Sequence, residues 1–306
     1  MSLFQKAQRR KAMLRLALCG PSGSGKTHSA LLLASGLTSG NIFVIDTEKG
    51  SALLEHGKPG IPDFSHAELN QPFSPARYCE YINTAVQEGA DCVIIDSLSH
   101  AWSGAGGILD EHDKATLADR SHNSFAAWRE VTPEHNRLVD TMLQCDAHLI
   151  VTMRTKTAWE VVENEKGKKK PIKIGLKPEQ REGMEYEFTV VWDLSVEGHI
   201  ATASKDRTSL FDGKHFVPSQ ETGFQLIEWL DLGIDSTVLS AEKMKALKKE
   251  VNSFAQVSLL ENWYRTHRQE FNLLTARHLQ EMMSHCGQKK QALINGNNGR
   301  SQSQQQ

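Results

Sequence analysis

The residues with the most definite chemistry stand between positions 20 and 27, where the chain reads Gly20-Pro-Ser-Gly-Ser-Gly-Lys-Thr27. This spacing is typical of a phosphate-binding loop, because its glycines let several backbone N–H groups point at one phosphate. We expect Lys26 to reach the β- and γ-phosphates of ATP and the Thr27 hydroxyl to bind Mg²⁺. The predicted nucleotide-binding residues are Gly20, Pro21, Ser22, Gly23, Ser24, Gly25, Lys26 and Thr27.

Three further apolar runs end in charged residues that suit the same chemistry. The run 91–97 has the acid Asp96 near its end, which we expect to hold the Mg²⁺ hydration shell opposite Thr27. The runs 41–48 and 148–154 end in Glu48 and Arg154. Ligands of parallel sheets bind beyond the carboxyl ends of the strands, so these side chains are predicted to meet the phosphate-binding loop at one rim.

The segments between these residues show the pattern of alternating strands and helices. A buried strand precedes the loop, and Ala30, Leu33, Ala34 and Leu37 follow it at helical spacing. Ser74-Pro75 and Thr132-Pro133 each predict a helix start. The alternation predicts an α/β fold whose mostly parallel sheet is covered on both faces. Residues 100–123 contain several glycines and polar residues and are predicted to form a mobile excursion.

Two groups of cations have more than one interpretation. Residues 157–175 resemble a β-hairpin with a basic tip, which is either a solvated turn or a contact for a DNA backbone. The lysines concerned are Lys166, Lys168, Lys169, Lys170 and Lys173. In the strand 200–207, Lys205 and Arg207 share one face. They either protect a sheet edge or reach the nucleotide of a neighbouring protomer.

Composition divides the chain into four parts. Residues 1–12 are predicted to be an N-terminal basic arm, 13–230 a nucleotide-binding domain, 237–290 a small helical domain with a helix capped by Ser240, and 295–306 a disordered tail. The formal net charge of −2 means that any basic patch is local. The odd number of cysteines without C-x-x-C spacing, and the lack of an apolar run long enough for a membrane span, favour a cytoplasmic protein.

Several stretches resemble the RecA-like P-loop ATPases, and in particular those encoded by phages for recombination and single-strand annealing. The likeness rests on residues 14–27, 43–48, 91–97, the strand end at Arg154, 175–188 and 203–207, and it covers roughly residues 1–225. The resemblance implies a RecA-like P-loop NTPase core in an α/β fold with a mostly parallel sheet, to which this chain adds the small C-terminal helical domain.

The same resemblance implies roles for individual residues. Glu48 matches the catalytic glutamate that polarises the attacking water, and Lys205 and Arg207 match paired cations that act in trans between subunits. Arg154 stands where RecA-type cores have a γ-phosphate-sensing glutamine, so its role in sensing, charge stabilisation or DNA contact stays open. With Lys26, these residues form the predicted catalytic set.

The leading hypothesis is therefore an Mg²⁺-dependent ATPase that assembles into a ring or filament on single-stranded DNA during recombination or annealing. A second hypothesis is a binding module in which ATP is a switch without turnover and the helical domain recruits a replication partner or a single-strand-binding protein. A third is a small-molecule kinase. The kinase hypothesis is disfavoured because the lid that closes over the substrates of such kinases usually supplies several arginines. The excursion 100–123 contains a single arginine, Arg120.

Overall fold

The computed structural model describes residues 9–163 and 169–303 of the chain. The chain folds into two compact units. Residues 13–230 form the first unit, and the described residues before and after them form the second. No helix among the described residues is long and apolar enough to cross a membrane.

The first unit is built on a sheet in which nine strands lie within the described residues. The central strands β3, β2, β4, β5, β1 and β7 are parallel neighbours in that order, and the antiparallel strands β8 and β9 continue the sheet beyond β7. Their bounds in chain order are β1 Arg15–Gly20, β2 Ile42–Asp46, β3 Ser65–Glu68, β4 Cys92–Asp96, β5 His148–Glu163, β6 Lys169–Pro178, β7 Val190–Leu194, β8 Ala201–Asp206 and β9 His215–Phe216.

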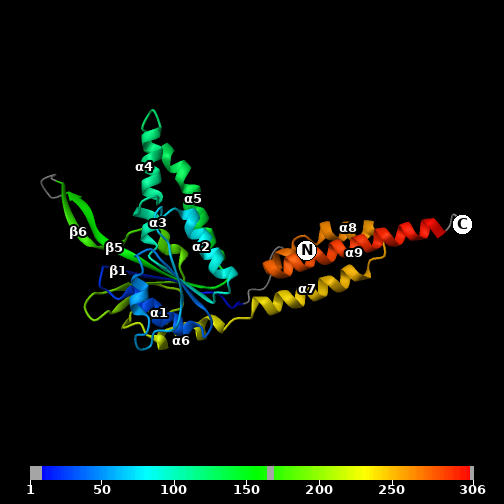
Figure 1. Cartoon of the computed structure of the whole chain (residues 1–306), viewed down its shortest axis with the longest axis horizontal. Coiled ribbons are helices and arrows are strands. Elements are labelled where there is room, and N and C mark those ends of the chain that lie inside the picture. Colours follow the sequence, from blue (N-terminus) through cyan, green and yellow to red (C-terminus); the bar gives the residue numbers. More distant parts are fainter. Residues whose placement is uncertain (1–8, 164–168, 304–306) are drawn as a thin grey trace. The chain divides into compact units, whose positions relative to one another are not determined.

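Helices cover both faces of this sheet (Figure 1). In β4, Val93 and Ile95 pack with helices α2 (Pro75–Gln87) and α5 (Ser124–Gln144). The alternate residues Cys92 and Ile94 pack on the opposite face with α1 (Lys26–Leu37) and α6 (Gln220–Asp231). Because successive side chains of a strand point to opposite faces, a strand buried on both faces is mostly apolar, as β4 is from Cys92 to Ile95 before it ends at Asp96.

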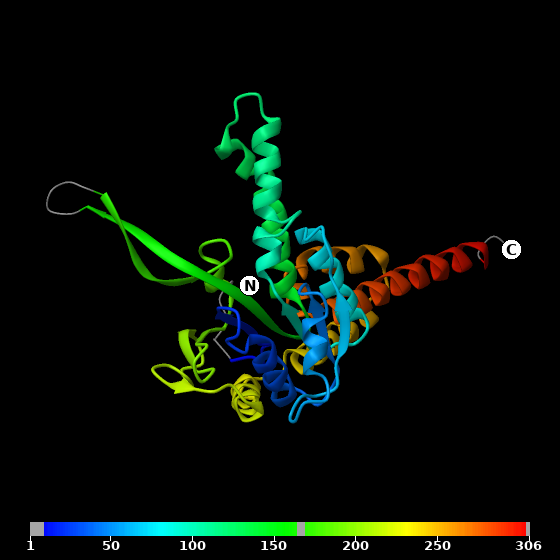
Figure 2. The same cartoon turned by 60° about the vertical axis from the view of Figure 1, so that its left-hand side comes forward.

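Residues 100–123 are not the mobile excursion that we expected. They contain all but the first residue of α3 (Ser99–Ser103) and all of α4 (Ile108–Ala118), and α4 lies beside α5 in a helical hairpin (Figures 1 and 2). The helix start predicted at Pro133 was also wrong, because Pro133 lies inside α5. The N-terminal cap is Asn123, whose side chain accepts hydrogen bonds from the N–H groups of the next turn.

The expected β-hairpin is confirmed. Strand β5 leaves the parallel sheet after Arg154, and its outer half pairs with β6 in antiparallel register from Thr155 opposite Pro178 to Glu163 opposite Lys169. Figures 1 and 2 show this hairpin extending away from the sheet. Of the predicted DNA-binding lysines, Lys169, Lys170 and Lys173 belong to β6. Lys166 and Lys168 lie outside the described residues.

The second unit is helical. It contains α7 (Ser236–Ser253), α8 (Val257–Thr266), the 3₁₀ turn η3 (Glu270–Leu273) and α9 (Ala276–Ser303). Their buried core includes Leu247, Leu260, Trp263, Phe271 and Met282. The expected α/β fold with a mostly parallel sheet and an added helical C-terminal region is therefore observed.

Two local expectations for the second unit are corrected. Helix α7 begins at Ser236 and is capped by Asp235, whose side chain accepts a hydrogen bond from the N–H of Thr237 at 2.7 Å, so Ser240 is not its cap. The side chain of Ser240 instead accepts from the N–H of Thr275 and is buried. Helix α9 continues to Ser303 and so includes most of the stretch 295–306 that we expected to be disordered. No proline interrupts that stretch.

Candidate functional site

The phosphate-binding loop connects the end of β1 at Gly20 to the start of α1 at Lys26. Gly23 and Gly25 have φ angles of 80° and 81°, in the left-handed region that glycine adopts without strain. Among the described residues, the backbone N–H groups of Gly25, Lys26 and Thr27 have no hydrogen-bond acceptor. The first N–H groups of a helix carry partial positive charge, so the geometry of this loop suits an anion.

The loop forms part of a cavity of about 640 Å³. Its lining includes the predicted residues Lys26, Thr27, Glu48, Asp96 and Arg154, which come from the loop and from the ends or margins of three other strands. The parallel register explains this meeting: Asp46 at the end of β2 pairs with Asp96, and Gly20 pairs with Arg154. Arg154 lies inside β5 rather than at its end, at the last position where β5 pairs with β1.

The ammonium group of Lys26 lies against the first two residues of the loop. Its Nζ donates hydrogen bonds to the carbonyl oxygens of Gly20 and Pro21, both at 2.9 Å. Burial lowers the pKa of Lys26, while the nearby carboxylates of Asp96 and Glu48 act in the opposite direction. An anion bound at the loop would add to the effect of these carboxylates and favour the charged ammonium group.

Thr27 and Asp96 lie in direct contact. The Thr27 hydroxyl donates to Asp96 Oδ2 at 2.6 Å, and the Thr152 hydroxyl donates to Asp96 Oδ1 at 2.5 Å. Asp96 is 1 % exposed, and burial raises its pKa although both hydroxyl groups lower it. A buried carboxylate paired with a hydroxyl oxygen is an all-oxygen donor set, which is the type that Mg²⁺ prefers. These residues therefore fit a Mg²⁺ ion beside the loop.

Glu48 is held from two directions. Its side-chain Oε1 accepts hydrogen bonds from Arg154 Nε at 3.0 Å and from Nη2 at 2.8 Å. Its backbone N–H donates to Asp46 Oδ1 at 2.6 Å. Asp46 is itself buried and also accepts from the N–H of Ala52 and from His66. The segment that carries Glu48 is thus anchored to the end of β2.

Other predicted residues do not line this cavity. Lys205 Nζ donates to the carbonyl oxygens of Glu185 and Tyr186 at 2.9 and 2.6 Å, and Arg207 Nη2 donates to that of Tyr186 at 3.1 Å. Both cations are therefore bound to the 3₁₀ turn η2 (Met184–Glu187) of the same chain. Within one protomer, the described structure does not bring them to the phosphate-binding loop.

Sequence reasoning missed several residues of the cavity. Glu55 lies at the end of the 3₁₀ turn η1 (Ser51–Glu55), and its carboxylate pairs with His28 at 2.8 Å. His28 directly follows the loop motif, so its position was a usable signal. Thr152 does not line the cavity, but its buried hydroxyl donates to Asp96; it was visible as a polar residue inside an apolar strand. Glu179 follows the β5–β6 hairpin and could not be predicted from the sequence, because it reaches the cavity only when β6 pairs with β5.

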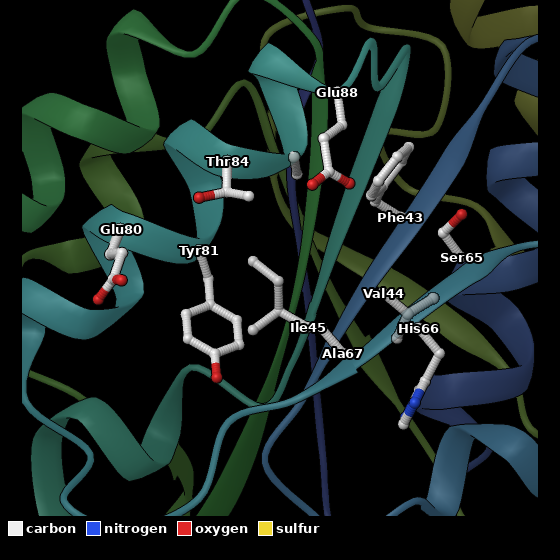
Figure 3. A pocket seen from close by; sticks show the side chains of 11 residues that line it. Phe43, Val44, Ile45, Ser65, His66, Ala67, Glu80, Tyr81, Thr84 and Glu88 are labelled. Carbon is white, nitrogen blue, oxygen red and sulfur yellow. The ribbon is translucent and has the colours of Figure 1, made fainter.

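A second, smaller cavity of about 360 Å³ lies between α2 and the strands β2 and β3 (Figure 3). Tyr81, Phe43 and Ile45 contribute apolar surface, and Glu80 and Glu88 are its acids. His66 also lines this cavity. Its Nε2 lies 3.2 Å from Oδ2 of Asp46, the residue that anchors the Glu48 segment. None of the phosphate-binding loop residues takes part in this cavity.

A family described as an AAA domain matches residues 12–222. No curated protein matches the chain. Among solved structures, the chain is similar to the crystal structure of the RadB recombinase, with 17% sequence identity and a TM-score of 0.36 over 71% of this chain and 90% of that one. Similarity at this level assigns no role to any residue.

Proposed function

This chain belongs to the AAA domain family, and from that membership together with its nucleotide-binding loop we propose that it is an Mg²⁺-dependent ATPase acting on single-stranded DNA in recombination or strand annealing. The observation that carries the proposal is the contact between Thr27 and Asp96 in the same cavity as Lys26 and Glu48. A cation-binding pair, a phosphate-binding loop and a carboxylate at one rim are the groups that phosphoryl transfer to water requires.

The proposed hydrolysis needs stabilisation of charge and a positioned water molecule. The N–H groups of the loop and Lys26 stabilise the negative charge that develops on the transferred phosphoryl group. Mg²⁺, held by Thr27 and Asp96, would neutralise further charge between the β- and γ-phosphates. Glu48 orients the attacking water or accepts its proton through its carboxylate. Its loop is fixed by the hydrogen bond to Asp46, which limits the positions that the carboxylate can adopt.

In this proposal, Arg154 couples DNA binding to ATP hydrolysis. This residue contacts Glu48 by its side chain, and its carbonyl oxygen accepts a hydrogen bond from the N–H of Glu179 at 2.7 Å. Arg154 and Glu179 flank the base of the β5–β6 hairpin, whose lysine-rich tip is the proposed DNA contact. Single-stranded DNA bound at the tip would therefore be linked, through the two strands of the hairpin, to Arg154 and Glu179, which line the cavity.

Oligomerisation is part of the proposal. Lys205 and Arg207 are bound to carbonyl groups of η2 within their own chain, Lys205 at a partly exposed position and Arg207 at an exposed one. We propose that they turn to the nucleotide of a neighbouring copy on assembly into a ring or filament. An arginine delivered in this way contributes about 10³–10⁵ in rate, so hydrolysis would depend on assembly.

The decisive experiment measures phosphate release from Mg–ATP with and without single-stranded DNA, for the wild type and for Lys26→Ala. We expect turnover that single-stranded DNA stimulates and that Lys26→Ala abolishes. Turnover at the background level in both conditions, with ATP still bound, would replace this proposal by a switch that does not hydrolyse ATP. ADP release that rises only with a sugar or nucleoside acceptor would replace it by a kinase.

A further inference from the structure

The turn between β7 and β8 brings a histidine to the phosphate-binding loop. If a Cβ were built on Gly25, it would lie 3.1 Å from His199 Nδ1 and 3.4 Å from Cγ. The imidazole ring therefore lies directly against the loop, and a side chain at position 25 would press on it. Neither the loop motif nor the proposed catalytic set includes His199.

The conformation of the turn holds this histidine in an unusual position. His199 has a φ of 51°, in the left-handed region that residues other than glycine seldom adopt. Ser195 closes the turn: its N–H donates to the carbonyl of Ile200 at 2.9 Å, and its Oγ accepts from the N–H of Ile200 at 3.1 Å. The His199 side chain is exposed and has no hydrogen-bond partner among the described residues.

The order of the strands indicates which end of a nucleotide His199 would meet. Asp96 and Arg154 belong to β4 and β5, and Glu48 follows the end of β2; these three strands all lie on one side of β1. The three residues mark the γ-phosphate end of the proposed site. Strand β7 lies on the other side of β1, and the His199 turn follows it. A nucleotide whose terminal phosphate faces the catalytic side therefore directs its nucleoside toward His199.

We infer that His199 contacts the ribose or base of the bound nucleoside triphosphate, by ring packing or by a hydrogen bond from the imidazole. The inference rests on the proposed ATP site and adds a residue that distinguishes a nucleoside triphosphate from bare triphosphate. Such a contact accounts for a three- to tenfold share of the affinity, about the range of one aromatic contact or one hydrogen bond. It is a binding contact and leaves the chemistry of the γ-phosphate to other residues.

The test compares the affinities of ATP and of inorganic tripolyphosphate, each with Mg²⁺, by isothermal titration calorimetry. The variant is His199→Asn, because asparagine tolerates the left-handed backbone and lacks the ring. The matched control is His122→Asn. His122 is also exposed and has a φ of 47°, but it lies in the turn before α5 and is not among the residues whose atoms lie against Gly25.

We expect His199→Asn to weaken ATP about three- to tenfold and to leave tripolyphosphate affinity unchanged, while His122→Asn changes neither. Equal weakening of both ligands would overturn the inference, because His199 would then act on the phosphates or on the loop itself. Unchanged ATP affinity in His199→Asn would overturn it as well. If the wild type bound neither ligand, the proposed function itself would fail, which separates the two failures.

Discussion

Glu48→Gln separates the chemical role of this carboxylate from its structural role. The amide retains an oxygen that can accept the hydrogen bonds of Arg154, so only the charge of the contact is lost. The side chains of Arg154 and Glu48 are 44% and 29% exposed. Exposed ion pairs contribute about 0.2–1 kcal/mol, so we expect the free energy of unfolding to fall by less than about 1 kcal/mol.

The catalytic effect of the same change is much larger. Removal of a group that orients or deprotonates the attacking water lowers a rate by about 10²–10⁴. ATP affinity is expected to be retained, because Glu48 is a negative charge beside a site for a polyanion and its loss removes repulsion. Phosphate release at saturating Mg–ATP, calorimetric ATP binding and thermal unfolding measure the three quantities on one preparation. A variant that keeps more than a third of the wild-type rate would refute the assigned role of Glu48, and so would one that no longer binds ATP.

Three further predictions concern assembly, DNA contact and acid stability. If the cation acts in trans, mixing Arg207→Ala subunits with Lys26→Ala subunits restores part of the ATPase activity that each variant lacks, whereas no recovery would favour a sheet-edge role for Arg207. Reversal of the charges at 168–170 should flatten the slope of log K against log salt for single-stranded DNA by about 2, since each lost contact contributes about 0.7; an unaltered slope would exclude the hairpin tip. Burial lowers the pKa of His135 to about 4 from its ordinary 6.5, so its contribution to stability is present above pH 6.5 and is lost as the pH falls toward 4, by up to about 3 kcal/mol. Urea unfolding at pH 7 and pH 4.5 should show a smaller difference for His135→Asn, and an equal difference would contradict this assignment.

The sequence predicted those parts of the site that depend on strand ends. Apolar runs closed by Asp96 and Glu48 are local patterns, and parallel pairing then brings them to one rim because the carboxyl ends of parallel strands coincide. The hairpin after Arg154 was likewise visible in its two apolar segments and intervening lysines. In these places the local pattern and the fold agree.

Other features depend on contacts between distant residues. The contact between His199 and Gly25 joins positions far apart in the sequence, and nothing about a histidine in a polar turn indicates it. The pairing of Arg154 with Glu48 required the order of the strands and the orientation of both side chains. The α4–α5 hairpin was missed because glycines and charged residues conceal its periodicity, although the cap residue Asn123 was a usable signal.

The central claim is that Lys26, Thr27, Glu48 and Asp96 surround one bound triphosphate and its magnesium ion. A crystal structure with Mg²⁺ and a non-hydrolysable ATP analogue tests this most directly. We expect the phosphates against the N–H groups that begin α1, a Mg²⁺ ion about 2.1 Å from Thr27 Oγ1, and the Glu48 carboxylate facing the γ-phosphate. A nucleotide bound elsewhere, or a Glu48 side chain directed away from the γ-phosphate, would contradict the account.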